Sequence, residues 1–305
     1  MSFEAFVAKA TGEQVRPYRY QTALAESGLP EVLRAPTGSG KTLAAVLPWL
    51  YRRIAHPDRN VRKATPHWLV VVLPQRTLVE QTVESARAWV EALGAPVGLH
   101  VLVGGEDSGD HEWKMHPDIE RIFVGTQDMV LSRLLMRGFA EFRSAWPMSF
   151  GLLHAGVQFV FDEVQLMGPG LPTSLQLHGL REALGTALPC RSMWMSATID
   201  VVELRTVDLH RPLSVVDVTE GAGELARRMA ATRRLGRLDL GADPRQYPAA
   251  LAARALAEHR PGTRTRSGRR SLDHARGRTS VPRAHHRRRR SPHLRRWSLL
   301  PRTAR

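Results

Sequence analysis

Residues 35–42 read Ala-Pro-Thr-Gly-Ser-Gly-Lys-Thr, between the apolar pair Val32–Leu33 and the helical pattern of residues 43–47. An apolar strand, a glycine loop and a helix start therefore follow one another directly. Glycines let backbone N–H groups approach anionic oxygens, and a helix N-terminus adds partial positive charge. The stretch predicts a phosphate-binding loop at the end of a buried strand.

The side chains of this loop predict a nucleotide and a metal ion as ligands. Lys41 can reach the β- and γ-phosphates, and the Thr42 hydroxyl can hold Mg²⁺. We therefore expect ATP and Mg²⁺ as cofactors, bound by the residues of the loop and the start of the helix: Thr37, Gly38, Ser39, Gly40, Lys41 and Thr42. The alternative is a chance glycine turn before a helix.

A second chemical motif lies at residues 158–165, Gln-Phe-Val-Phe-Asp-Glu-Val-Gln. An apolar run with carboxylates only at its end is typical of a central parallel strand that delivers them to the ligand edge of a sheet. We expect Asp162 to hold Mg²⁺ with Thr42, and Glu163 to orient and deprotonate the attacking water. With Lys41 they form the candidate catalytic set. The alternative is an ordinary strand followed by an acidic capping pair.

The alternation of strand and helix patterns predicts an α/β fold with a largely parallel central sheet. Strands are expected at 32–35, 68–74, 98–104, 121–125, 157–162 and 191–196. Helices are expected near 41–55, 77–93, 127–137 and 173–187, with a further one from Tyr247 to His259.

Charge divides the chain unevenly. Residues 262–305 hold fifteen of the 44 basic residues, all of them Arg, but one of the 29 acidic residues. The rest of the chain is therefore nearly neutral, so the net charge of +15 does not by itself indicate a folded nucleic-acid-binding domain. The segment 262–305 lacks hydrophobic periodicity, and we expect a disordered basic tail.

Other function classes are disfavoured by composition. The longest apolar run, Trp68–Leu73, is too short to span a bilayer, and the first residues lack the pattern of a signal peptide. The single cysteine, Cys190, cannot form an internal disulfide. We therefore expect a cytoplasmic protein without a membrane partner.

The Ala-x-Thr-Gly-Ser-Gly-Lys-Thr form of the loop resembles that of superfamily 1 and 2 helicases, whose ATP-binding domains are RecA-like. Across residues 3–261, the order of motifs is similar to that of the CRISPR-associated helicase–nuclease of type I interference systems. The most specific strings are Gly-Thr-Gln-Asp-Met at 125–129 and Asp-Glu-Val-Gln-Leu-Met-Gly at 162–168. This resemblance implies ATP-dependent translocation on DNA, with single-stranded DNA and a crRNA-guided surveillance complex as partners.

The resemblance also implies residue roles. Gln21, in Pro-Tyr-Arg-Tyr-Gln at 17–21, would hydrogen-bond the adenine base. Four residues would couple nucleotide state to domain movement: Gln165, Ser196, Ala197 and Thr198. Seven would contact the nucleic acid: Pro74, Arg76, Gln81, Gly104, Gly105, Thr126 and Gln127.

Each nucleic-acid contact has a structural alternative. Arg76 and Gln81 could be exposed residues at a helix start, and Gly104–Gly105 could be a plain turn. Thr126 is also a favourable N-cap residue.

The resemblance stops near Thr265. A motor of this type needs a second RecA-like domain, which supplies arginines to the transferred phosphoryl group. An arginine-rich stretch stands where its first strand should begin, and no Gln-x-x-Gly-Arg-x-x-Arg string or His-Asp dipeptide follows. With no domain before the core, we expect a subtype whose nuclease is C-terminal.

We therefore expect a first RecA-like domain at 1–210, a linker and aborted second domain at 211–261, and a frameshifted tail at 262–305. The expected function is the ATP-binding half of a helicase with poor turnover. The alternatives are a non-enzymatic nucleic-acid-binding fragment acting through its basic tail, and a P-loop phosphotransferase. The latter is disfavoured by the ordered set of helicase motifs.

Overall fold

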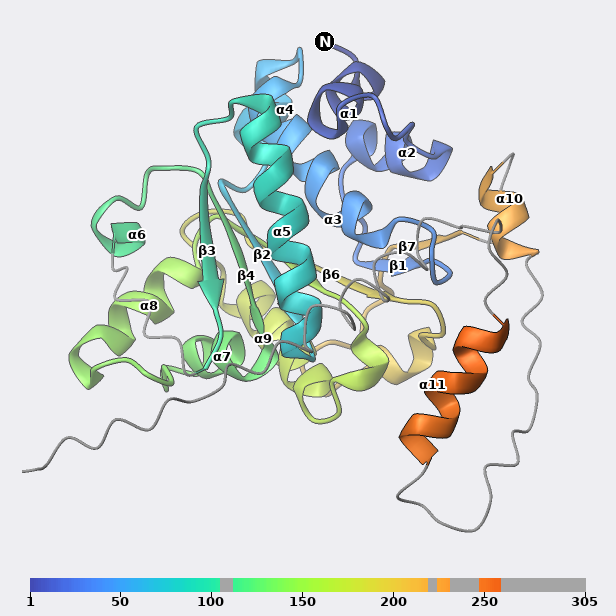
Figure 1. Cartoon of the computed structure of the whole chain (residues 1–305). Coiled ribbons are helices and arrows are strands. Elements are labelled where there is room, and N and C mark those ends of the chain that lie inside the picture. Colours follow the sequence, from blue (N-terminus) through green and yellow to red (C-terminus); the bar gives the residue numbers. More distant parts are fainter. Residues whose placement is uncertain (105–111, 219–223, 231–246, 259–305) are drawn as a thin grey trace, which may run out of the picture. The chain divides into compact units, whose positions relative to one another are not determined.

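The structure, a computed structural model, describes residues 1–104, 112–218, 224–230 and 247–258. Its centre is a sheet of seven strands in the order β3-β4-β2-β5-β6-β1-β7, and every pair is parallel (Figure 1). The strands are β1 (Val32–Arg34), β2 (Trp68–Leu73), β3 (Gly98–Leu102), β4 (Arg121–Thr126), β5 (Val157–Phe161), β6 (Arg191–Ser196) and β7 (Val215–Asp217). The predicted α/β fold with a parallel sheet is confirmed.

Helices cover both faces of the sheet, which gives three layers (Figure 1). One face carries α1 (Phe3–Thr11), α2 (Arg19–Ser27), α3 (Lys41–Leu50) and α5 (Arg76–Leu93). The other carries α7 (Gln127–Leu134), α8 (Trp146–Leu153) and α9 (Gly170–Leu184). Shorter helices are α4 (Arg59–Ala64), α6 (Glu112–Met115) and α10 (Glu224–Met229), and three 3-10 turns lie at Arg143–Ala145, Val164–Leu166 and Val201–Leu204.

Strand β2 shows why the sequence adopts this arrangement. All six of its side chains are buried, which is typical of a parallel strand covered on both faces. Leu69 and Val71 belong to the cluster under α1, α3 and α5, whereas Trp68 and Val70 belong to the cluster under α7 and α9. Because successive side chains point to opposite faces, one apolar run fills two cores.

Helix ends follow local chemistry. Ser2 caps α1 by accepting a hydrogen bond from the Ala5 amide (3.3 Å), and α5 ends at Gly94 in the left-handed conformation. Pro48, inside α3, lacks an N–H donor, and the helix continues as a π-helical turn, Tyr51–Ala55. The predicted helix over 41–55 is therefore correct in extent but mixed in type.

The remaining boundaries agree within a few residues. Strand β3 ends two residues before the expected 104, and α7 ends at Leu134 because Met136 turns left-handed (φ 54°). The sequence analysis did not anticipate helices α1, α2, α4, α6, α8 and α10, nor strand β7.

The chain divides into two units, Met1–Thr232 and Arg233–Arg305. Strand β7 lies beyond residue 210, the expected end of the first domain, and pairs with β1, so the sheet continues into the segment expected to be a linker. In the second unit the described element is α11 (Tyr247–Glu258), which agrees with the predicted helix over 247–259. The tail at 262–305 lies outside the described residues.

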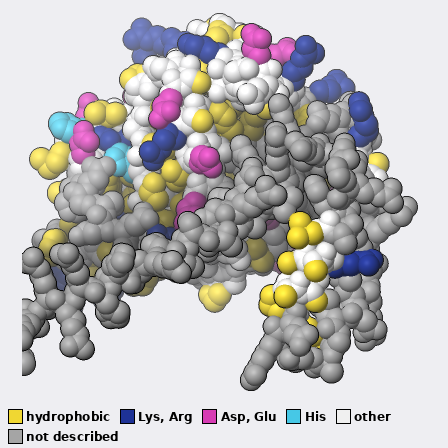
Figure 2. All heavy atoms as spheres, in the orientation of Figure 1, with side chains coloured by type: hydrophobic (Ala, Val, Ile, Leu, Met, Phe, Trp, Pro, Cys, Tyr) yellow, Lys and Arg dark blue, Asp and Glu magenta, His cyan; other side chains and the backbone are white. Residues whose placement is uncertain are grey.

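Among the described residues, no helix has the length and apolarity that a membrane span requires. On the face seen in Figure 2, basic and acidic side chains are scattered together over the coloured part of the surface. This mixture agrees with the near-neutral composition of residues 1–261.

The packing of α9 predicts a strong effect of a single methyl group. A Cβ at Gly179 would overlap the backbone carbonyl of Asp208, which cannot move aside as a flexible side chain could. We expect Gly179→Ala to lower the free energy of unfolding by about 1–3 kcal/mol, as overpacking does. Urea denaturation of the full chain measures it.

Gly151→Ala in α8 is the matched control, because a Cβ there meets nothing within 4 Å. Alanine is favoured over glycine inside a helix by roughly 0.5–1 kcal/mol, so this variant should be neutral or more stable. Equal effects of the two substitutions would contradict the proposed packing at Asp208.

Candidate nucleotide and nucleic-acid site

The predicted motifs meet at one edge of the sheet. In a parallel sheet all carboxyl ends lie on the same side, and ligands bind there. The phosphate loop follows β1, Pro74 follows β2, and Asp162 and Glu163 follow β5. Thr126 lies opposite Leu73 in the pairing of β4 with β2, and Ser196 is the last residue of β6. The topology therefore gathers segments distant in sequence into one site.

The phosphate loop depends on two glycines with positive φ, Gly38 (83°) and Gly40 (79°). Gly40 is the N-cap of α3, and a Cβ there would lie 2.8 Å from Gln21 Nε2. A side chain at position 40 is therefore strained by the positive φ, and it would also displace the Gln21 amide. Thr37 and Gly38 are exposed, Ser39 is buried, and Thr42 is half-buried on the first turn of α3.

Lys41 and Glu163 form an ion pair across the site. Lys41 Nζ lies 2.8 Å from Glu163 Oε1, and only 8 % of the Lys41 side chain is exposed. Glu163 adopts the left-handed conformation (φ 51°), which is uncommon for a residue with a side chain. Such strain is found at functional sites, where the surrounding structure maintains it. The pair places the candidate base directly beside the lysine that ends the phosphate loop.

The two carboxylates at the end of β5 are electrostatically different. Burial raises the pKa of Asp162 to about 6, Lys41 opposes this rise, and the Glu163 charge adds to it. Burial would also raise the pKa of Glu163, but the hydrogen bonds from Lys41 and Gln165 lower it overall. Glu163 is therefore ionised at neutral pH, whereas Asp162 gains a proton near pH 6 unless a cation replaces it.

Hydrogen bonds link this pair to the end of β6. Gln165 Nε2 donates to Glu163 Oε2 (2.7 Å), and Ser196 Oγ donates to Gln165 Oε1 (2.7 Å). The Thr198 amide donates to Ser196 Oγ (3.1 Å). A continuous chain of hydrogen bonds therefore joins Lys41 to the Ser-Ala-Thr segment, and the role of that segment in coupling stays a prediction. Ala197 lies within this segment and is half-buried.

Side chains on the first turn of α2 contact the phosphate loop. Gln21 is buried, its Oε1 accepts from the Tyr18 amide (2.8 Å), and its Nε2 donates to the Gly40 carbonyl (3.1 Å). Tyr20 OH donates to the Ser39 carbonyl (2.7 Å). Sequence reasoning missed the contribution of Tyr20, because a lone tyrosine in a resembling motif carries no signal of its partner. The contact of Gln21 with an adenine base stays a prediction.

The seven residues predicted to contact nucleic acid lie mostly on the same edge of the sheet. Arg76 and Gln81 are exposed on the first turns of α5, and Arg76 Nε lies 3.5 Å from Glu80 Oε1. Gly104 is exposed after β3, whereas Gly105 lies outside the described residues.

Thr126 is the N-cap of α7, where its side chain makes no capping hydrogen bond. Gln127, half-buried on the first turn of α7, has a buried Oε1 without a hydrogen-bond partner among the described residues. Their contacts with nucleic acid remain predictions.

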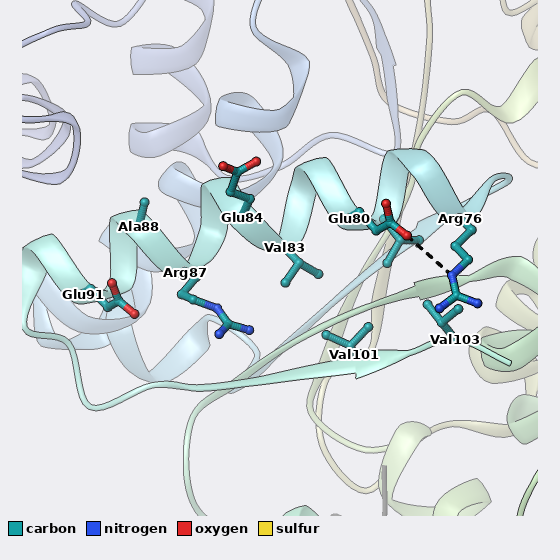
Figure 3. A pocket seen from close by; sticks show the side chains of 10 residues that line it. Arg76, Glu80, Val83, Glu84, Arg87, Ala88, Glu91, Val101 and Val103 are labelled. Atoms are coloured by element: carbon teal, nitrogen blue, oxygen red, sulfur yellow. Dashed lines mark ion pairs between the residues drawn. The ribbon is translucent and has the colours of Figure 1, made fainter. Parts of the chain in front are cut away.

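A groove of 520 Å³ runs between α5 and the edge strand β3 (Figure 3). Its floor is apolar, and its rim carries three acidic and two basic side chains. The charged residues are Arg76, Glu80, Glu84, Arg87 and Glu91. Because the acids outnumber the bases, this groove does not favour a polyanion, and it is separate from the phosphate loop.

The parallel sheet, the phosphate loop and the linked Asp162–Glu163 pair define a P-loop nucleotide-binding domain of the RecA-like type. A profile of the DEAD/DEAH box helicases matches residues 18–207. The chain belongs to the DEAD/DEAH box helicase family, whose members contain an ATP-dependent helicase core.

Curated relatives are similar over short parts of their length. The "Probable ATP-dependent RNA helicase DDX28" of Mus musculus is 31% identical over 122 residues, which cover 38% of this chain and 22% of the relative. The "DEAD-box ATP-dependent RNA helicase 16" of Arabidopsis thaliana is 26% identical over 210 residues, covering 65% and 31%. The chain therefore spans less than a third of the length of these relatives.

Solved structures support the fold. The DUF1998 helicase MrfA superposes with a TM-score of 0.51 at 18% identity, over 70% of this chain and 32% of MrfA. MrfA bound to DNA superposes with a TM-score of 0.50 at the same identity, over 71% and 29%.

The position of Lys41 generates a binding prediction. We expect Lys41→Ala to abolish detectable Mg²⁺–ATP binding, because a charge-assisted contact contributes about 1.5–3 kcal/mol and Glu163 would be left without its cation. Calorimetry on the full chain measures the affinity. Lys63→Ala, an exposed position on α4, is the control. Retained binding in a folded Lys41→Ala protein would refute the phosphate-loop assignment.

The raised pKa of Asp162 generates a pH prediction. Below about pH 6 the carboxyl group is protonated in the nucleotide-free protein, and Mg²⁺ must displace that proton. The association constant for Mg²⁺–ATP should therefore fall as pH decreases through 6, by about tenfold per pH unit well below the pKa.

The Asp162→Asn variant gives the reference pH profile of Mg²⁺–ATP binding, because ATP itself titrates in the same way with the wild-type protein and with the variant. The difference between the two pH profiles isolates Asp162. Parallel profiles from pH 7.5 to 5 would show that Asp162 does not bind the metal.

Proposed function

We propose that this chain is the ATP-binding half of a nucleic-acid motor, a DNA helicase or translocase of CRISPR-associated type I interference. The observation that carries the motor function is the hydrogen-bonded chain from Lys41 through Glu163 and Gln165 to Ser196. It connects the phosphate loop with the segment that faces the neighbouring domain in such enzymes. A phosphotransferase would have no use for this connection.

The residues fit an ATP–Mg²⁺ complex. Lys41 would hold the terminal phosphates, while Thr42 and Asp162 would hold the metal, which supplies charge neutralisation on the phosphate oxygens. Glu163 would accept the proton of the attacking water. Its lowered pKa makes it ionised at neutral pH, and release from Lys41 would make it a stronger base.

The choice of DNA and of the CRISPR system is supported by sequence strings alone. Gly-Thr-Gln-Asp-Met at 125–129 and Asp-Glu-Val-Gln-Leu-Met-Gly at 162–168 resemble the CRISPR-associated enzyme. The curated relatives are named RNA helicases, whereas a superposed MrfA structure is bound to DNA. The partners we propose are single-stranded DNA and a crRNA-guided surveillance complex.

The domain assignment is part of the proposal. Residues 1–210 would form the first RecA-like domain, 211–261 the linker and beginning of a second, and 262–305 a basic tail. Within the described residues, the side-chain hydrogen bonds of Lys41 and Glu163 are with each other and with Gln165, so no arginine takes part in them. An arginine supplied by another domain contributes roughly 10³–10⁵ in rate to related sites.

We therefore expect the purified 305-residue chain to bind ATP but to hydrolyse it at a small fraction of the rate of an intact motor. We also expect no unwinding of duplex DNA. A coupled ATPase assay with single-stranded DNA or RNA, together with a fluorescent unwinding assay, measures both. Glu163→Gln is the control because it preserves the shape of the side chain. Fast DNA-stimulated turnover that Glu163→Gln abolishes would contradict the proposed dependence on a second domain.

The arginine content of residues 262–305 favours a second candidate, non-enzymatic binding through the tail. Binding by the tail would weaken steeply with salt and ignore nucleotide, because it rests on phosphate neutralisation. Binding by the motor site would change between ATP and ADP and would be altered by Glu163→Gln. Fluorescence anisotropy of the full chain on labelled single strands, at several salt concentrations, separates the two.

A further inference from the structure

A cluster outside the nucleotide site brings together two carboxylates and an imidazole. Glu31 directly precedes β1, and His178 and Glu182 lie one turn apart on α9. One ligand atom from each residue lies within 4.8 Å of the others. A His and a Glu four residues apart on a helix project to the same side, as metal ligands on helices do.

His178 is buried without satisfying its ring nitrogens. The residue is 4% exposed and packs edge-on against the Trp194 ring (5.3 Å). Neither nitrogen has the geometry of a hydrogen bond with a described residue, although Nε2 lies within ion-pair distance of both carboxylates. Nε2 faces the two carboxylates instead, 3.5 Å from Glu31 Oε1 and 3.3 Å from Glu182 Oε1. A buried unsatisfied polar group is costly, and a cation bound to Nε2 would remove that cost for this nitrogen.

These spacings suit a small tetrahedral ion. With bonds of about 2.1 Å to nitrogen and oxygen, two ligands of a tetrahedral Zn²⁺ ion are about 3.4 Å apart. Both distances from His178 Nε2 are close to this value. One imidazole and two carboxylates leave a fourth position for water, as in known zinc sites with three protein ligands.

Arg211 now supplies the positive charge at this point. Its Nη2 contacts Oε1 of both Glu31 and Glu182, the two oxygens that face His178. Its Nη1 and Nε donate to the other oxygens, Glu31 Oε2 (3.1 Å) and Glu182 Oε2 (3.0 Å). The Arg211 side chain is 41% exposed, so it can withdraw toward solvent. The cluster is built around a cation, and the arginine leaves His178 unsatisfied.

We propose that Glu31, His178 and Glu182 form a site for a divalent transition metal ion of the zinc class, which displaces Arg211 Nη2. The ion would join the start of β1, which leads into the phosphate loop, to α9, which follows the Asp162–Glu163 segment. It would act as a structural brace between these two parts of the domain. The site is independent of the proposed motor function.

The test is a titration of chelator-treated full-length protein with Co²⁺, whose visible absorption reports tetrahedral ligands, followed by competition with Zn²⁺. We expect the protein to bind Co²⁺, and we expect His178→Ala to lower the Co²⁺ affinity at least about ten- to hundredfold. Loss of an outer-shell partner already lowers metal affinity by this factor, and His178 would be a direct ligand. Glu182→Gln tests the same site at a half-exposed position, where the fold is easily retained. Thermal melting confirms folding of each variant.

Arg211→Ala distinguishes the metal site from a simple ion-pair network. If the arginine competes with the metal, its removal should tighten Co²⁺ binding, because two carboxylates lose their resident cation. The chain has 13 histidines, so weak background binding is expected in every variant. The proposal would be overturned if the Co²⁺ affinity and spectrum were unchanged in both His178→Ala and Glu182→Gln. Weaker Co²⁺ binding by Arg211→Ala would overturn it as well.

Discussion

The ion pair between Lys41 and Glu163 is the interaction on which the site depends. It joins the loop after β1 to the end of β5, two strands separated by β6, and places both side chains at the C-terminal edge of the sheet. A buried lysine needs a partner, because an uncompensated charge is strongly unfavourable. Glu163 is that partner here. Its other carboxylate oxygen accepts a hydrogen bond from Gln165, which in turn accepts one from Ser196. Nucleotide phosphates would take the place of Glu163 and release it for chemistry.

Sequence reasoning predicted the fold correctly and proposed the chemical residues from the same kind of local pattern. Buried parallel strands are continuous apolar runs, and the glycine loop has positions that only glycine tolerates. It could not foresee that Lys41 would bond Glu163, 122 residues away, or that Glu163 would be left-handed. Strand β7 was missed because its three residues are largely exposed and form no buried apolar run, so that its pairing with β1 appears only in the tertiary structure. The Glu31–His178–Glu182 cluster was missed because Glu31 is far in sequence from the other two residues and only the tertiary fold brings them together.

The bond between Gln21 and the phosphate loop has a mechanical consequence. Gln21 Nε2 rests against the backbone at Gly40, which has no side chain to separate them, and it donates to the carbonyl of that residue. A base that engages this amide must therefore compete with, or pull on, the turn that shapes the phosphate loop. Base recognition and phosphate binding would then both depend on the position of the Gln21 amide against Gly40. A base of the wrong shape would shift this amide and so weaken phosphate binding by the loop, even when the phosphates themselves fit.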